Sequence, residues 1–317
     1  MVKPIMLGIC SAFFFSVTFI LNRSMELSGG SWLWSSSLRY FFMVPFLVCI
    51  VLARKNLRPL FETMRERLGS WILWSTIGFG LFYAPLCFAA AYAPGWLTAS
   101  TWLISIISGS LLAPLFFVTA GGKRVRGKIP FRGLTFSVLI LAGIVLMQIE
   151  HAGHISRIEA ALGFFPVLIA SFAYPLGNRK MMELCGGKLD VFQRVLGMTI
   201  ASLPFWLVLS VFGILQSGLP SAGQTFQSLL VAISSGVIAT VLFFKATDLV
   251  RGNMTKLAAV EATQSMEVLF TVFGELLIVS TLFPSLLSCV GMVIIMGGMV
   301  LHSYFSQRMN RKLEVQL

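Results

Sequence analysis

The sequence predicts an all-α integral membrane protein with ten transmembrane helices, arranged as two inverted five-helix repeats. Three observations predict it: the apolar composition, the long apolar runs from end to end, and a short polar phrase that recurs after half the chain. Of the 317 residues, 57% are hydrophobic and only 11% are charged. Because soluble domains carry about 25% charged residues, this composition indicates that the bilayer is the solvent for most of the chain.

Each expected span is an apolar run close to the length of about 20 residues that a helix needs to cross the hydrocarbon core. The first run follows Lys3 and has the position of a signal peptide. It is long, however, and lacks a small-residue cleavage site, so we expect a retained helix. The ten runs lie at 4–22, 32–53, 70–92, 97–120, 132–150, 160–178, 191–215, 226–249, 255–279 and 284–305.

Basic residues gather in alternate loops and predict the orientation. The loops 54–69 and 121–132 each hold five Lys or Arg residues, and with ten spans they lie on the same side as the basic C-terminal tail. We expect Arg179 to follow the sixth span and to lie on this side too. Because such loops stay in the cytoplasm, both termini should be cytoplasmic and the protein should reside in the cell membrane. The net charge of +12 then reflects topology and requires no nucleic-acid partner.

A repeated phrase divides the chain into two halves. The residues 22–30 read NRSMELSGG and the residues 178–187 read NRKMMELCGG, each after the first span of a half. With five spans in each half, the second half enters the membrane from the opposite side, which is a common plan of secondary transporters. We therefore predict one repeat over residues 1–152 and an inverted repeat over residues 153–317.

The ninth span carries three carboxylates, Glu261, Glu267 and Glu275. At about 100° per residue they share one arc of the helix with Gln264 and Thr271, and the opposite arc is apolar. A polar stripe in a membrane helix should face protein or water, because exposure to lipid is costly. The acids either tie helices together or bind a proton or a cation. Three on one stripe favour the second reading for Glu267 and Glu261, whereas Glu275 fits both.

The fourth span is the expected repeat partner of the ninth, and it also carries polar residues on one face. We expect the two helices to enclose a substrate cavity, with aromatic side chains supplying flat surfaces for a cation or an apolar molecule. For each residue, simple helix packing remains the alternative. The expected cavity residues are Gln264, Thr271, Thr101, Trp102, Ser105, Ser108, Tyr83 and Tyr174.

The second span of each half has one arginine near its start: Arg39 in the first half and Arg194 in the second. They are candidate charge partners for the acids or for a solute. Alternatively, because both lie near a span end, their guanidinium groups could reach out to the interface. Lys245 and Asp248 are spaced i,i+3 and are expected to pair with each other.

The run VEATQSMEVLFTVFGELL, Val260 to Leu277, is similar to the Gly-Glu stretch of the drug/metabolite transporter superfamily. The whole chain resembles that superfamily in architecture, and the branch of multidrug resistance efflux transporters is the nearest likeness. The sequence has Glu261-Ala262 where the superfamily usually has Glu-Pro. The small four-helix exporters use a glutamate in the first helix. The first span here has no acid, so the acids of the ninth span would have to serve instead.

This resemblance implies a secondary transporter that works by alternating access and exports a small organic or drug-like, cationic solute in exchange for protons. A metabolite carrier for an anionic or zwitterionic solute, read by Arg39 or Arg194, is the alternative. A membrane scaffold or sensor and an intramembrane enzyme are less favoured, since no nucleophile with a base is evident. We expect no cofactor and no metal. The partners are the solute, the lipid bilayer and protons, and the chain is either a monomer or a homodimer.

Overall fold

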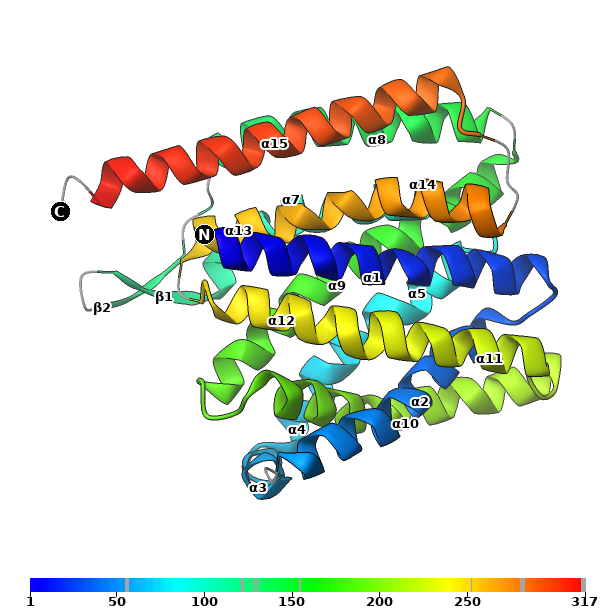
Figure 1. Cartoon of the computed structure of the whole chain (residues 1–317), viewed down its shortest axis with the longest axis horizontal. Helices are drawn as coiled ribbons and strands as arrows, with labels where there is room; N and C mark the ends of the chain where they lie inside the picture. Colours follow the sequence, from blue (N-terminus) through cyan, green and yellow to red (C-terminus); the bar gives the residue numbers. More distant parts are fainter. Residues whose placement is uncertain are drawn as a thin grey trace.

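The computed structural model of the chain is 86% helical, and several of its long helices, such as α1, α8 and α15, run in nearly the same direction (Figure 1). The structure describes residues 1–54, 57–120, 123–127, 129, 131–153, 155–251, 253–279 and 283–314. Within these ranges, side chains are described except at 118–120, 123, 124, 131–133, 136, 254, 255, 258 and 302–314.

The first part of the chain contains two long helices, a third interrupted by a π-helix, a fourth broken by a turn, a β-hairpin and a further helix. In order, these elements are α1 (Val2–Leu27), α2 (Trp32–Ala53), α3 (Leu57–Glu66), α4 (Leu68–Ser75), the π-helix η1 (Thr76–Gly80), α5 (Leu81–Ala89), α6 (Gly95–Trp102), α7 (Ile104–Leu111), the 3-10 helix η2 (Ala113–Leu115), β1 (Phe117–Ala120), β2 (Lys123–Arg126) and α8 (Phe131–Ala152).

The second part repeats this order without the short helix and the hairpin. The side chains of Ser156 and Asp190 begin its first two helices, each as part of a reciprocal capping box. Its elements are α9 (Arg157–Cys185), α10 (Val191–Ser217), α11 (Ala222–Val231), the π-helix η3 (Ala232–Ala239), α12 (Thr240–Asp248), α13 (Met254–Glu261), the 3-10 helix η4 (Ala262–Ser265), α14 (Met266–Ile278) and α15 (Leu286–Glu314).

Among the described residues, six helical segments are long and apolar enough to cross a membrane. Shorter apolar stretches of this kind lie in α8, at 137–152, and in α15, at 286–301. The chain is therefore a multi-pass membrane protein by the length and composition of its helices. The six segments are α1, α2, residues 68–89, α9, α10 and residues 222–248.

Three expectations about element boundaries are wrong. Residues 117–120, placed at the end of the fourth span, form β1, which pairs antiparallel with β2. The helix ends instead at Leu111, shortly before Pro114, whose ring cannot continue the i to i−4 hydrogen bonds. The loop 54–69 contains α3, and α9 runs on to Cys185, so Arg179 lies inside a helix.

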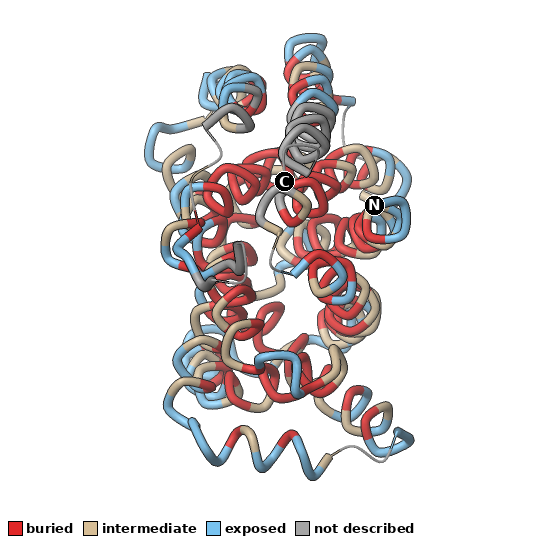
Figure 2. Tube along the Cα trace, turned by 90° about the vertical axis from the view of Figure 1, so that its left-hand side faces the viewer, coloured by how far each residue is buried: buried red, intermediate tan, exposed pale blue. Residues whose placement is uncertain are grey.

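Burial follows the pattern expected for a bundle in lipid. The inner faces of the helices are buried and the outer faces are exposed (Figure 2). Many exposed side chains are large and apolar, for example Leu277 at 84% and Val293 at 71% exposure. The helices α8 and α15 pack against each other along one edge of the bundle (Figure 1). Exposed apolar surface of this extent fits lipid contact rather than water.

The helix α9 crosses the π-helix η1 at two facing glycines. A Cβ built on Gly177 would lie 2.2 Å from the Cα of Gly78 and 3.0 Å from the carbonyl oxygen of Trp74. Gly177→Ala is therefore expected to destabilise the protein by about 1–3 kcal/mol, because the backbone itself must move. Thermal melting of the purified protein in detergent tests this expectation.

Gly69→Ala is the matched control, since a Cβ at Gly69 would meet nothing within 4 Å. The control should melt at the wild-type temperature or slightly above it. If Gly177→Ala melts together with the control, the close crossing of α9 and η1 is wrong.

Candidate functional site

The acidic stripe of the ninth span is turned into the protein. Glu261, Glu267 and Glu275 are 6%, 1% and 0% exposed, and Gln264 and Thr271 between them are buried as well. On the other side of the same segment Phe273 and Leu277 are exposed. The segment is not one continuous α-helix, because η4 separates α13 from α14. The stripe is thus buried as the sequence predicts, but its angular spacing differs from that of an ideal helix.

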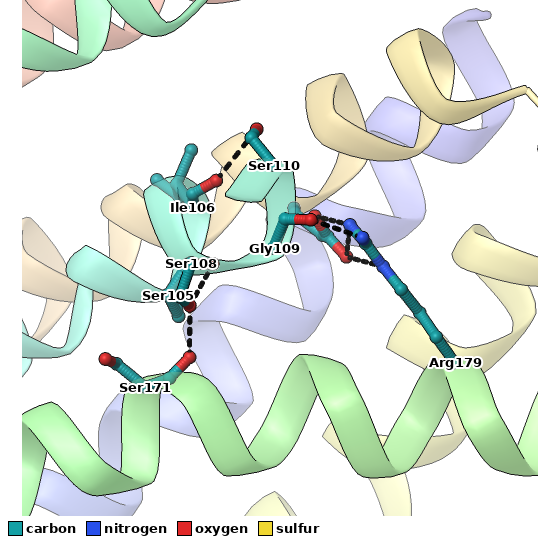
Figure 3. Close-up of polar contacts among 8 residues, drawn as sticks. Ser105, Ile106, Ser108, Gly109, Ser110, Ser171 and Arg179 are labelled. Carbon is teal, nitrogen blue, oxygen red and sulfur yellow. Dashed lines mark hydrogen bonds and ion pairs between the residues drawn. The ribbon is translucent and has the colours of Figure 1, made fainter. Parts of the chain in front are cut away.

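Glu261 forms a buried ion pair with Arg179 of α9. The guanidinium donates Nη2–H bonds to both carboxylate oxygens of Glu261, at 2.8 and 2.7 Å, and an Nε–H bond to Oε1 at 3.2 Å. It also donates to the carbonyl oxygen of Gly109 in α7, and Figure 3 shows Arg179 reaching across from α9 to that turn. Both side chains of the pair are almost fully buried. The charge of Glu261 is therefore compensated within the protein, and three helical segments are tied together.

Sequence reasoning missed Arg179 as a site residue and assigned it to a cytoplasmic loop. A signal was present, because no helix breaker follows until Gly186, which adopts a left-handed conformation at φ 57° and ends α9. An α-helix that continues to that glycine carries Arg179 on its buried face.

Glu275 accepts hydrogen bonds from backbone N–H groups at the start of α6. The donors are Gly95, at 2.8 Å, and Trp96, at 3.1 Å. The first N–H groups of a helix have no partner within the helix, and a carboxylate there also interacts favourably with the helix dipole. The structure therefore places Glu275 as the cap of α6, joining α14 to the fourth helical segment.

Glu275→Ala is accordingly expected to lower stability by about 1–2 kcal/mol, because two buried N–H groups lose their acceptor. Solute flux per folded molecule should be retained. Melting of the variant and flux through equal amounts of reconstituted protein test the two expectations separately. An unchanged melting temperature, or lost flux in a fully folded sample, would contradict the capping role.

Glu267 differs from both of these acids. It is buried, and neither of its carboxylate oxygens has a hydrogen-bond partner in the part of the chain that the structure describes. Its side chain lines a small cavity between α1, α2, α5, α6, α9 and the η4–α14 segment. The other residues that line this cavity are Phe15, Thr18, Phe19, Arg39, Phe82, Leu86, Trp102, Tyr174 and Gln264.

A second small cavity adjoins the first. Trp102, Tyr174 and Gln264 line both cavities and so separate Glu267 from Glu261. Ser105 lines this second cavity. Sequence reasoning placed all four of these polar or aromatic residues at the cavity, and the structure brings them together there.

Four other expected cavity residues make packing contacts and line neither cavity. Thr101 accepts from the side-chain amide of Gln148 in α8, at 2.6 Å. Ser108 donates to the carbonyl oxygen of Ser171 and so joins α7 to α9 (Figure 3). Thr271 is fully buried. The ring of Tyr83 packs against the guanidinium of Arg39, which itself lines the first cavity.

The arginines Arg39 and Arg194 do not reach the interface, since their side chains are 2% and 3% exposed. Arg194 pairs with Asp248 at 2.7 Å, so the expected pairing of Asp248 with Lys245 is wrong. Arg39 lines the first cavity, and its guanidinium carbon lies 4.0 Å from the ring centre of Tyr83. Its Nε and Nη1 atoms have no hydrogen-bond partner among the described residues.

Comparison with known proteins gives four findings. A family model described as "EmrE: Putative multidrug resistance efflux transporter" matches residues 2–308. The chain is 58% identical to the Uncharacterized protein YjlA of Bacillus subtilis (strain 168), over 99% of this chain and 98% of that one. It is also 52% identical to an uncharacterized 42.1 kDa protein of Shouchella clausii, over 84% of this chain and 70% of that one.

A crystal structure of a protein that is 14% identical matches with a TM-score of 0.66. The match covers 98% of this chain and 99% of that one. At this identity the likeness concerns the fold alone.

Proposed function

This chain belongs to the EmrE family of multidrug resistance efflux transporters, and from that premise we propose that it is a proton-coupled secondary transporter. It exports a small organic solute with a cationic group by alternating access. The observation that carries this proposal is Glu267, a buried carboxyl group that has no hydrogen-bond partner in the described part of the chain and lines a cavity with aromatic walls. Ionisable groups inside a membrane are costly and mark pathways for protons and solutes.

The proposed architecture has ten spans in two inverted halves, residues 1–152 and 153–317. The order of elements supports it, because the third helical segment of each half contains a π-helix, η1 or η3, and the fourth is interrupted, at Leu103 or at η4. The repeated phrase supports it too. Just after α1 and α9 it places a glycine with positive φ, Gly29 at 76° and Gly186 at 57°.

The proposed orientation puts both termini in the cytoplasm. The start of α1, the basic segments α3 and β1–β2, and the end of α15 lie at one end of the molecule (Figure 1). An end that gathers the basic segments fits the cytoplasmic side of the cell membrane.

The proposed exchange takes place at one carboxyl group. A neutral carboxyl group is cheaper to bury than an unpaired carboxylate, so Glu267 carries a proton when the cavity is empty. A cationic solute that enters from the cytoplasm pairs with the carboxylate as the proton leaves. The aromatic faces of Trp102 and Tyr174 stabilise the same cation. On the outer side a proton displaces the solute, so one solute moves outward as a proton moves inward. Glu261, held by Arg179, forms the wall of the second cavity.

Transport by the full chain in proteoliposomes under an imposed pH gradient tests this proposal. We expect gradient-driven flux of a cationic dye such as ethidium, and we expect Glu267→Gln to abolish it. Glu62→Gln is the control, because Glu62 lies on the exposed face of α3, where it pairs with Arg58. Normal gradient-driven flux in both Glu267→Gln and Glu261→Gln would exclude this mechanism.

A further inference from the structure

Buried arginines in this protein are paired, with one exception. Among the described residues, Arg39, Arg179 and Arg194 are the arginines with side chains no more than 4% exposed. Arg179 and Arg194 each hold a carboxylate at 2.7 Å. Arg39 and Arg194 each have two nitrogen atoms without a hydrogen bond among the described residues, but Arg194 holds Asp248 with its third, whereas Arg39 has no carboxylate partner there.

Buried carboxylates show the same pattern. Glu261 has Arg179, and Glu275 has two backbone N–H groups at the start of α6. Glu267 has no partner for either oxygen among the residues that the structure describes. Each class of buried charged side chain therefore has one member that the described protein leaves uncompensated.

These two uncompensated side chains, Arg39 and Glu267, line the same cavity and do not pair with each other. Trp102 and Tyr174 line the same cavity. The ring of Tyr83 lies beneath the guanidinium, and its hydroxyl oxygen also accepts a hydrogen bond from the group. The Nε and Nη1 atoms of Arg39 remain without an acceptor among the described residues. Buried N–H donors of a guanidinium ordinarily have acceptors, so the acceptor for Arg39 should come from what occupies the cavity.

We propose that the cavity binds an amphoteric solute, one that carries a carboxylate or similar anionic group, a cationic amine and a flat apolar body. Arg39 binds the anionic group, Glu267 binds the amine, and the aromatic side chains hold the body. The amine half of this proposal rests on the function proposed for Glu267, whereas the anion site at Arg39 does not. A solute with an amine alone would meet the unopposed positive charge of Arg39 and bind less well.

Equilibrium binding to the purified full chain tests the proposal with three compounds that share a phenyl ring. 2-Phenylethylamine carries only the amine, 3-phenylpropionate only the carboxylate, and phenylalanine both. By isothermal titration calorimetry we expect phenylalanine to bind at least about ten-fold more tightly than either analogue, since each charged hydrogen-bonding partner typically contributes a factor of this size.

Substitutions separate the two subsites. Arg39→Gln should weaken phenylalanine about ten-fold and leave 2-phenylethylamine bound equally or more tightly, because a like charge is removed. Glu267→Gln should weaken phenylalanine and spare 3-phenylpropionate. Arg65→Gln, on the exposed surface of α3, is the control and should change nothing. If Arg39→Gln does not fold, Arg39→Lys replaces it. In that variant phenylalanine should bind more weakly than to the wild type but still more tightly than either analogue.

Two results would overturn the proposal. One is 2-phenylethylamine binding as tightly as phenylalanine to the wild type. The other is an equal loss of binding affinity for all three compounds in a folded Arg39 variant, which would indicate that Arg39 has a structural role. Ethidium flux, measured on the same preparations, reports separately on proton-coupled transport. If flux is lost but phenylalanine still binds more tightly than both analogues, the proposed function alone is refuted. If flux is normal but phenylalanine binds no more tightly than the analogues, the amphoteric solute alone is refuted.

Discussion

Arg179→Met is expected to destabilise the protein by about 3–5 kcal/mol, because it leaves the carboxylate of Glu261 buried without its partner. The guanidinium supplies three hydrogen bonds to that carboxylate and another to the carbonyl oxygen of Gly109. Methionine is similar in length and apolar, so the loss reports mainly on the missing donors and charge. Thermal unfolding in detergent, followed by loss of the monodisperse peak in gel filtration, measures it.

The partner substitution decides whether charge or packing is responsible. In the double variant Arg179→Met with Glu261→Met no orphan charge remains, and most of the lost stability should return, since buried ion pairs contribute little over apolar residues of similar volume. The single variant should also recover partly as the pH is lowered, because protonation removes the uncompensated charge of Glu261.

An exposed pair provides the control. Arg58 and Glu62 are also separated by 2.7 Å, but their side chains are 89% and 59% exposed. Arg58→Ala should leave the melting temperature unchanged, because water solvates both groups and screens the pair. If Arg179→Met and Arg58→Ala had the same small effect, the guanidinium of Arg179 would not be buried against Glu261.

Hydropathy predicted helices well where both ends of a helix are set by local signals. The expected span 32–53 coincides with α2, and the burial of the ninth-span stripe followed from its polar residues facing away from lipid. Hydropathy failed where a helix continues beyond its apolar part. The apolar run of the sixth span stops near residue 178, but α9 continues to Cys185, so a basic residue assigned to a loop became a buried partner of Glu261.

Partnerships between side chains were predicted least well, because they depend on which helices pack together. Spacing within one helix predicted that Lys245 pairs with Asp248, whereas Arg194 from another helix takes that carboxylate. Likewise, the sequence grouped Glu261 with Glu267 as candidate exchange sites and left the role of Glu275 open. Their different surroundings, a guanidinium for Glu261, backbone N–H groups for Glu275 and a cavity for Glu267, arise from segments far apart in the chain.

Glu267→Met is expected to raise the stability of the protein and to abolish gradient-driven flux. The buried carboxyl group has no partner among the described residues, so an apolar side chain of similar volume removes a desolvation cost without breaking a contact. The gain should be about 1–3 kcal/mol, the range associated with a buried polar group that lacks a hydrogen bond. Melting in detergent measures the gain, and ethidium flux under a pH gradient measures the loss, because an ionisable group inside the membrane marks the proton pathway.

The opposite signs of the two effects separate function from structure. A residue retained for folding loses stability when it is replaced, as we expect for Arg179, whereas a residue retained for transport can be replaced with a gain. Glu275→Met is the matched control, because the same substitution in the same helix removes a cap and should destabilise. If Glu267→Met lowered the melting temperature as Glu275→Met does, Glu267 would have a structural partner, and its assignment as the site of proton exchange would fail.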